Sequence, residues 1–127
     1  TYFNSADELQ REPEFVDDIK NLTVAQGRDA TFTCIVNHLG EFKVAWVKAD
    51  TKAIQAIHSQ VITHNERIKV SHKQHNIWNL HILSVEKVDS GPYMCQINTV
   101  PMKSRSGNLE VVVPPDFILS DISGDTM

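Results

Sequence analysis

The chain has 127 residues, which is enough for one domain of ordinary size but not for two. Hydrophobic residues make up 41% and charged residues 22% of the sequence, as is usual for a folded globular protein. The formal net charge of -4 and the scattered lysines and arginines exclude a surface built to bind nucleic acid, because phosphate contacts require clustered positive charge.

Residues 1–13 are polar and acidic and end at Pro13, which predicts a flexible N-terminal segment ahead of the folded domain. From residue 14 to residue 114, short β-rich runs alternate with turn residues, a spacing typical of a sandwich or barrel. With a split first strand counted once, the runs predict about nine strands. They occupy residues 15–16 with 22–24, 30–36, 43–47, 53–58, 61–63, 68–71, 78–82, 93–98 and 108–113.

Two consecutive prolines end the last predicted strand, because Pro114 and Pro115 cannot donate to a ladder and also restrict the residue before them. Residues 115–127 carry a short apolar run followed by small polar residues. We interpret them as a linker and the truncated start of a following domain. No run of 18 apolar residues occurs, so no membrane-spanning segment is predicted.

The two cysteines, Cys34 and Cys95, both lie in apolar, β-branched segments where a strand would direct each sulfur inward. Two cysteines alone do not settle the redox compartment, since a cytosolic protein can carry two unpaired thiols. The context favours a disulfide and therefore an oxidising compartment. A bridge that closes a loop of 61 residues stabilises a domain by roughly 3–5 kcal/mol in the chain-entropy model.

Three features at consistent positions predict the fold. Trp46 follows Cys34 by twelve residues, and Tyr93 precedes Cys95 by two within Asp89-Ser90-Gly91-Pro92-Tyr93. This spacing is that of a variable-type immunoglobulin β-sandwich, an all-β fold in which a tryptophan packs on the inter-sheet disulfide and a tyrosine hydroxyl bonds nearby backbone. Arg67 and Asp89 resemble the salt bridge that closes one end of such domains, and Leu80 with Ile82 supplies facing core positions.

A narrower resemblance rests on three stretches: VAWVKADTKAI at residues 44–54, YMCQINT at 93–99 and VVVPPD at 111–116. They resemble the first domain of the Dpr-interacting proteins, invertebrate neuronal surface receptors related to lachesin and the IgLON proteins. The match covers roughly residues 15–118.

This resemblance implies an extracellular receptor of several immunoglobulin domains on the surface of neurons, usually membrane-tethered, with a lipid anchor as one form of the tether. Its first domain is implied to pair with the first domain of a Dpr-type receptor, or with itself, in neuronal wiring and synaptic specificity. A secreted immunoglobulin module or decoy would fold identically and is the alternative.

Alternation along the strands predicts where a partner would bind. Tyr93, Cys95 and Ile97 point inward, so the residues between them face outward, and the same parity exposes Ala45 and Val47. Small and apolar side chains on a solvated sheet face favour a protein interface with amides around it. The predicted partner-binding residues are Val47, Ala49, Lys52, Ile54, Ala56, Asn65, Gln96, Asn98, Pro101 and Met102.

The alternative interpretation of these residues is structural. In that case Ile54 or Ile57 packs under the edge strands, and the other apolar residues are scattered over the surface.

Other chemistry has weak support in the sequence. The six histidines show no zinc-ligand spacing, although their titration below pH 7 could modulate an interface that holds His58 or His64. No nucleophile elbow, phosphate loop or HExxH motif occurs, so we expect no enzyme activity, no metal and no cofactor. Asn21-Leu22-Thr23 is the only N-glycosylation acceptor sequence and predicts a glycan on Asn21.

Overall fold

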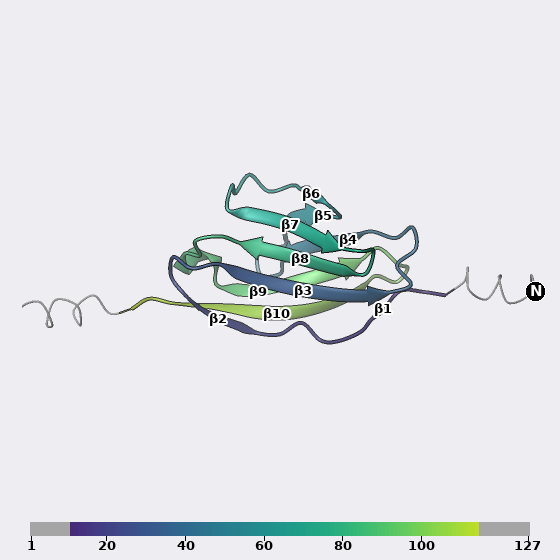
Figure 1. Ribbon diagram of the computed structural model, residues 1–127, viewed down its shortest axis with the longest axis horizontal. Coiled ribbons are helices and arrows are strands. Elements are labelled where there is room, and N and C mark those ends of the chain that lie inside the picture. The colour runs from purple at the N-terminus through teal and green to yellow at the C-terminus, as the bar shows by residue number, and fades with distance from the viewer. Residues whose placement is uncertain (1–10, 115–127) are drawn as a thin grey trace, which may run out of the picture.

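The computed structural model describes residues 11–114, which form a sandwich of two β-sheets (Figure 1). One sheet has the strand order β1-β3-β8-β7: β1 (Glu14–Phe15), β3 (Ala30–Asn37), β8 (Ile77–Ile82) and β7 (Ile68–Lys73). The other has the order β2-β10-β9-β4-β5-β6: β2 (Leu22–Ala25), β10 (Lys103–Val112), β9 (Gly91–Ile97), β4 (Val44–Lys48), β5 (Ala53–Ile57) and β6 (Gln60–Val61). A short 3₁₀ helix, η1 (Lys87–Asp89), precedes β9.

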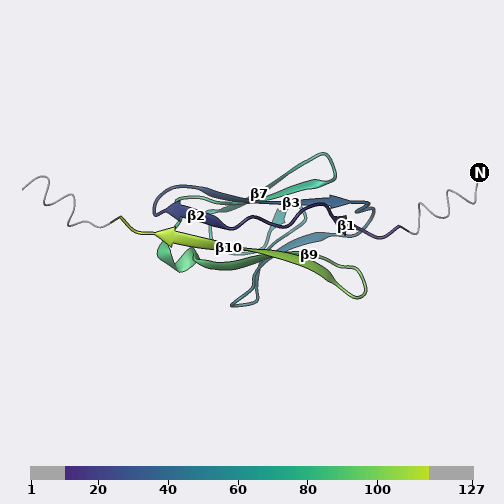
Figure 2. The same ribbon diagram turned by 90° about the horizontal axis from the view of Figure 1, so that it is seen from below.

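The two layers are seen edge-on in Figure 2, with β3 and β7 in one and β9 and β10 in the other. This arrangement confirms the predicted immunoglobulin sandwich, including the split first strand. Most of the predicted N-terminal segment and the predicted linker, residues 1–10 and 115–127, lie outside the described residues.

The first strand changes sheets between β1 and β2. Glu14 pairs antiparallel with Asn37 of β3, whereas Leu22 pairs parallel with Leu109 of β10. The crossing segment passes close over Gly107, where an added Cβ would lie 2.6 Å from a methyl group of Ile19. Only glycine therefore allows the segment to cross here without displacing backbone or core.

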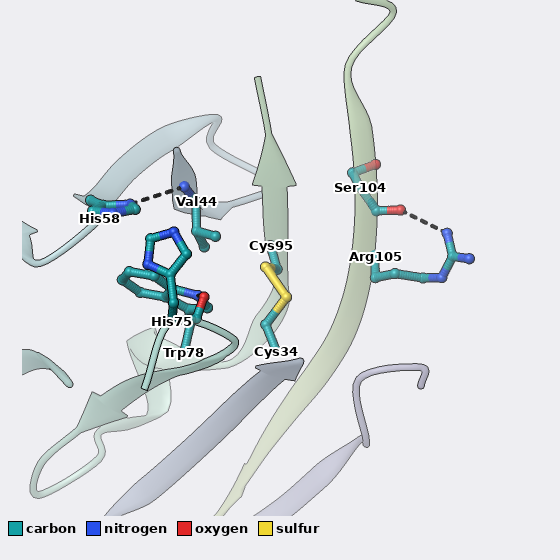
Figure 3. The surroundings of a disulfide bond; sticks show 8 residues. All are labelled: Cys34, Val44, His58, His75, Trp78, Cys95, Ser104 and Arg105. Carbon is teal, nitrogen blue, oxygen red and sulfur yellow. Dashed lines mark hydrogen bonds between the residues drawn. A yellow bond between two sulfur atoms is a disulfide. The ribbon is translucent and has the colours of Figure 1, made fainter. Parts of the chain in front are cut away.

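Side chains of β3 alternate between core and solvent as expected for a strand: Ala30, Phe32 and Cys34 are buried, and Thr31 and Thr33 are exposed. Cys34 is bonded to Cys95, which confirms the predicted disulfide (Figure 3). Each cysteine has a tryptophan as its cross-strand partner, Trp46 for Cys95 and Trp78 for Cys34. The bridge is thus flanked by a large, almost fully buried aromatic residue in each sheet.

One end of the sandwich is closed by polar contacts around Asp89, which is 5% exposed. Arg67 donates from Nη1 to Oδ2 at 2.6 Å and from Nη2 to Oδ1 at 2.9 Å. The Glu86 amide also donates to Oδ2, at 2.7 Å. Burial acts to raise the pKa of Asp89, but the hydrogen bonds from Arg67 and the Glu86 backbone outweigh it and hold the pKa below its usual value.

Tyr93 completes this end of the domain. Its hydroxyl donates to the backbone carbonyl of Asp89 at 2.7 Å, and its side chain is 1% exposed. Burial, followed by the nearby negative charge of Asp89, raises the pKa of the Tyr93 hydroxyl well above its usual range. The hydroxyl therefore remains a hydrogen-bond donor throughout the physiological pH range.

The last strand begins earlier than expected, since β10 starts at Lys103 rather than at residue 108. Its first half is polar because it lies beside the N-terminal strand at the edge of the sandwich. Lys103 Nζ donates to the carbonyl of Pro13 at 2.8 Å, and the Arg105 guanidinium lies 5.0 Å from the ring centre of Phe15. The first half of β10 is held by these polar contacts and shows no alternation of apolar and polar residues, so the sequence pattern did not predict it as a strand.

Candidate protein-binding face

Two cross-strand rows of side chains lie on the outward side of the six-stranded sheet. The first row contains Ser104, Gln96, Ala45 and Ile57, and the second contains Ser106, Met94, Val47 and Ile54. They point away from the core because the residues alternating with them, such as Trp46 and Cys95, are buried within it. We call these eight residues the outer face.

The outer face carries no formal charge. Ile54 and Ile57 are 45% and 38% exposed. Val47 lies between Met94 and Ile54 and is only 7% exposed. Gln96 Nε2 lies 3.2 Å from the sulfur of Met94, so these two side chains support each other in the centre. Such a surface loses little on desolvation, because few of its groups must give up strong bonds to water.

A shallow hollow of about 350 Å³ opens on the second row. Its wall combines sheet residues with the hairpin that joins β4 to β5. The lining residues are Val47, Ala49, Lys52, Ile54, Met94 and Gln96. Five of the predicted partner-binding residues therefore lie together around one depression, and Lys52 is exposed at its rim.

The prediction that Ala56 faces outward is wrong. Trp46 pairs with Ala56, but the next residue, Val47, pairs with Ile54, so Gln55 is an extra residue in β5. This bulge reverses the alternation, and Ala56 is fully buried beside Trp46. The Gln55 carbonyl accepts the amides of Ile62 and Thr63 at 2.9 and 3.1 Å, which stabilises the edge beyond β5.

Asn98 and Asn65 support the backbone around the outer face. Asn98 Oδ1 accepts the amide of Lys43 at 2.7 Å, which ties the end of β9 to the start of β4. Asn65 lies in the connection between β6 and β7, outside the two rows, and its Oδ1 accepts the amide of Arg67 at 3.0 Å. Both side chains therefore have a structural bond in the free domain.

Pro101 and Met102 lie in the loop between β9 and β10, where both are exposed and Met102 retains 57% of its accessible surface. Thr99 Oγ1 donates to the carbonyl of Pro101 at 2.9 Å and fixes the loop. Met102 immediately precedes β10, whose second residue, Ser104, begins the first row. These loop residues extend the apolar surface past the end of the sheet.

Five residues of the outer face are not among the predicted partner-binding residues. Ala45 and Met94 were expected to face outward but were not included, and Ile57, Ser104 and Ser106 were not placed on this face. Their place depends on the pairing of β10 with β9 and of β5 with β4. The two serines were not predicted because β10 begins earlier than expected. The outward direction of Ile57 was not predicted because the bulge changes which residues of β5 face outward. Gln60 of β6 pairs with Ile57 and continues the first row, whereas Val61 pairs with the buried Ala56 and lies on the other side of the sheet.

Asn21 is exposed immediately before β2, and β2 is the edge strand farthest from β6 in this sheet. Its Oδ1 accepts the amide of Asn108 at 2.9 Å, so Nδ2, the atom that carries a glycan, is not used in that bond. We expect protein made in a secretory host to lose mass on glycosidase treatment and the Asn21→Gln variant to lose none. An unchanged wild-type mass would contradict glycosylation at this asparagine.

Within residues 11–114, no group of three or more histidine, cysteine or acidic side chains is placed to hold a metal ion. Over the same residues, no helix is long and apolar enough to cross a bilayer.

The profile of the immunoglobulin I-set domain matches residues 13–113. Among solved structures, a chain of the complex of Dpr1 IG1 with DIP-eta IG1 is 47% identical, with a TM-score of 0.79, over 81% of this chain and 98% of that chain. DIP-gamma IG1+IG2 is 44% identical, with a TM-score of 0.81, over 84% of this chain and 51% of that chain. The RIG-5 IG1 homodimer is 34% identical, with a TM-score of 0.76, over 81% of this chain and 100% of that chain.

Similarity to characterised proteins extends to adhesion molecules. The Zwei Ig domain protein zig-8 of Caenorhabditis elegans is 31% identical over 74% of this chain, and human Cell adhesion molecule 1 is 25% identical over 84%. This chain spans 35% of the first protein and 24% of the second.

Proposed function

The chain belongs to the immunoglobulin I-set family, and from that membership we propose that it is a cell-surface recognition module that pairs through its outer face with the first immunoglobulin domain of a partner receptor. The partner is a Dpr-type receptor or a second copy of this domain. Solved relatives support this choice, since Dpr1 IG1 is bound to DIP-eta IG1 and the first domains of RIG-5 and ZIG-8 form homodimers.

The observation that carries the proposal is the uncharged outer face across the centre of the six-stranded sheet. Stable interfaces have an apolar centre that excludes water and a rim that supplies hydrogen bonds. Here Val47 and Met94 form the centre, Ile54 projects beside them, and Gln96 offers an amide that orients a partner. The two serines of β10 and Lys52 supply the polar rim.

The wider role that we propose is recognition between neurons, with the whole protein held at the cell surface by a tether and contributing to neuronal wiring and synaptic specificity. The alternative is a secreted module or decoy that binds the same partners without a tether. An anchor signal in the full-length gene product separates the two, because binding by the isolated domain is the same in both cases.

The proposal is tested by measuring binding of this domain to a panel of first immunoglobulin domains from Dpr-type receptors and to itself. Two variants place a lysine on opposite faces of the sandwich: Met94→Lys on the outer face and Thr33→Lys on the four-stranded sheet, where Thr33 is exposed. We expect Met94→Lys to weaken binding by at least about tenfold, because a lysine there must be desolvated without a partner.

Thr33→Lys is the matched control and should leave binding unchanged. The reverse pattern would move the interface to the four-stranded sheet. A folded wild-type domain that binds no member of the panel, including itself, would overturn the proposed function.

A further inference from the structure

Three histidines surround the indole ring of Trp78 and come from both sheets. His58 follows β5, His72 lies on β7, and His75 lies in the turn before β8. Their ring centres are 4.2, 4.7 and 6.0 Å from that of Trp78. Figure 3 shows His58 and His75 on the same side of the disulfide as Trp78. The cluster therefore joins the end of β5 to the four-stranded sheet.

His58 is bonded to Val44 of β4 in two ways. Its backbone amide donates to the Val44 carbonyl at 2.6 Å, and its ring Nδ1 lies 3.4 Å from the Val44 amide (Figure 3). The backbone of His58 is left-handed, with φ of 57°. The ring thus stands beside the backbone of β4 at the point where the ladder between β4 and β5 ends.

The Val44 amide depends on this ring. The Asn98 amide donates to Lys43 on the β9 side of β4, so alternation directs the amide of the following residue, Val44, toward β5. Val44 is fully buried. The acceptor on the β5 side is Nδ1 of His58, and an imidazole nitrogen accepts a hydrogen bond only when it carries no proton.

Protonation affects the three histidines differently. The His72 Nδ1 and the His75 Nε2 face the carbonyls of Gln74 and Gly40 at 2.7 and 3.0 Å, so both nitrogens donate and keep their bonds when the rings become charged. A proton on Nδ1 of His58, in contrast, removes the acceptor of a buried amide. An unsatisfied buried donor is costly, which makes His58 the acid-sensitive member of the cluster.

The charges around His58 act in the same direction. Burial lowers its pKa first, followed by Lys43 just before β4, by His75 in the β7–β8 turn and by His72 on β7. All three groups are cationic or become cationic in acid. The folded domain therefore favours the neutral ring.

We propose that neutral His58 is a positioning residue that holds the end of β5 against β4, and that acidification releases this hold and weakens pairing through the outer face. The effect on pairing rests on the proposed function. His58 and Val44 can affect the outer face directly, because their chain neighbours Ile57 and Ala45 belong to its first row. A compartment more acidic than the cell exterior would then loosen a complex formed at neutral pH.

The decisive variant is His58→Asn. The Oδ1 of asparagine can accept near the position of Nδ1, asparagine tolerates a left-handed backbone, and its amide does not titrate between pH 5 and 8. The matched control is His64→Asn, which makes the same change at an exposed histidine in the connection between β6 and β7. In NMR spectra recorded over a range of pH for the wild type and for His64→Asn, we expect the amide signal of Val44 to shift with pH. The midpoint of that shift should equal the midpoint at which the His58 ring titrates.

The same signal should be insensitive to pH in His58→Asn. A Val44 amide that does not respond while the His58 ring titrates in the wild type would overturn the hold between these residues.

Stability provides a second readout. The folded-state pKa of His58 is depressed, so its contribution is present above the usual value of 6.5 and is lost as the pH falls toward the lower folded value. The unfolding constant of the wild type should rise more steeply in this window than that of His58→Asn, by at most about tenfold per pH unit for one proton. Equal pH dependence in the two proteins would contradict this.

Binding to the partner found in the panel, measured at pH 7.5 and 5.5, tests the coupling to the outer face. We expect the loss of affinity in acid to be at least threefold greater for the wild type than for His58→Asn. Equal losses would overturn the coupling. If no first domain binds at either pH, the proposed function fails, whereas the Val44 signal still decides whether His58 acts as the acid-sensitive hold.

Discussion

Replacing Ile54 with aspartate is expected to weaken partner binding more than tenfold and to leave the fold intact. Ile54 is 45% exposed and ends the second row of the outer face beside Val47. In a complex the new carboxylate would be desolvated without a partner, and the loss of an apolar anchor commonly costs about 2 kcal/mol or more. The affinity is measured by surface plasmon resonance against the partner found in the panel.

The free energy of unfolding should change by no more than about 0.5 kcal/mol, as is usual for exposed positions. Val88→Asp is the matched control, because Val88 is a 73% exposed β-branched residue in η1, outside the outer face. It should leave binding unchanged. If Ile54→Asp unfolds the domain while Gln96→Ala leaves binding intact, Ile54 has a structural role and the interface lies elsewhere.

Asp89→Ala is expected to cause a clear loss of stability. The substitution leaves the Arg67 guanidinium and the Glu86 amide without the carboxylate to which both donate. Removing one partner of a fully buried ion pair typically costs about 3–5 kcal/mol. Arg67 is 25% exposed and also lies 3.8 Å from Glu86, so we expect a loss toward the lower end of that range. Chemical denaturation at pH 7 measures the loss, and a difference below about 1 kcal/mol would contradict a major role for this contact.

Acid should reduce the difference in the free energy of unfolding between the wild type and Asp89→Ala. The pKa of Asp89 lies below the usual 3.8, so its contribution is fully present above that pH and is lost as the pH falls through the lower folded value. Asp50→Ala is the control: Asp50 also accepts two bonds from a cation, Lys48, but it is exposed, and its removal should leave the denaturation midpoint nearly unchanged.

The sequence was sufficient for the fold because a few residues carry strong and mutually consistent signals. The spacing of Cys34, Trp46, Tyr93 and Cys95 places two strands of opposite sheets face to face, and the structure confirms the disulfide. The resemblance to first domains of Dpr-interacting proteins is also confirmed, since solved DIP-gamma and DIP-theta structures include chains that are 44–45% identical to this one.

The outer face could be predicted only in part, because alternation within one strand says nothing about register with its neighbours. Gln96 and Val47 follow from parity with buried residues of their own strands. Ala56 does not, because the bulge at Gln55 changes the parity between Ile54 and Ala56. The serines of β10 enter the rows through pairing with β9, which no local pattern encodes.

The pairing of β2 with β10 has a mechanical consequence for the domain. The described chain enters and leaves at opposite ends of the long axis of the sandwich (Figure 1). Because β2 and β10 run parallel, tension between the two ends pulls these strands past each other. The hydrogen bonds that join Leu22–Ala25 to β10 are then loaded in shear, all together rather than one after another. Behind them the Cys34–Cys95 bond prevents the 61-residue loop from extending. Under load, the domain can lengthen only through the chain outside that loop.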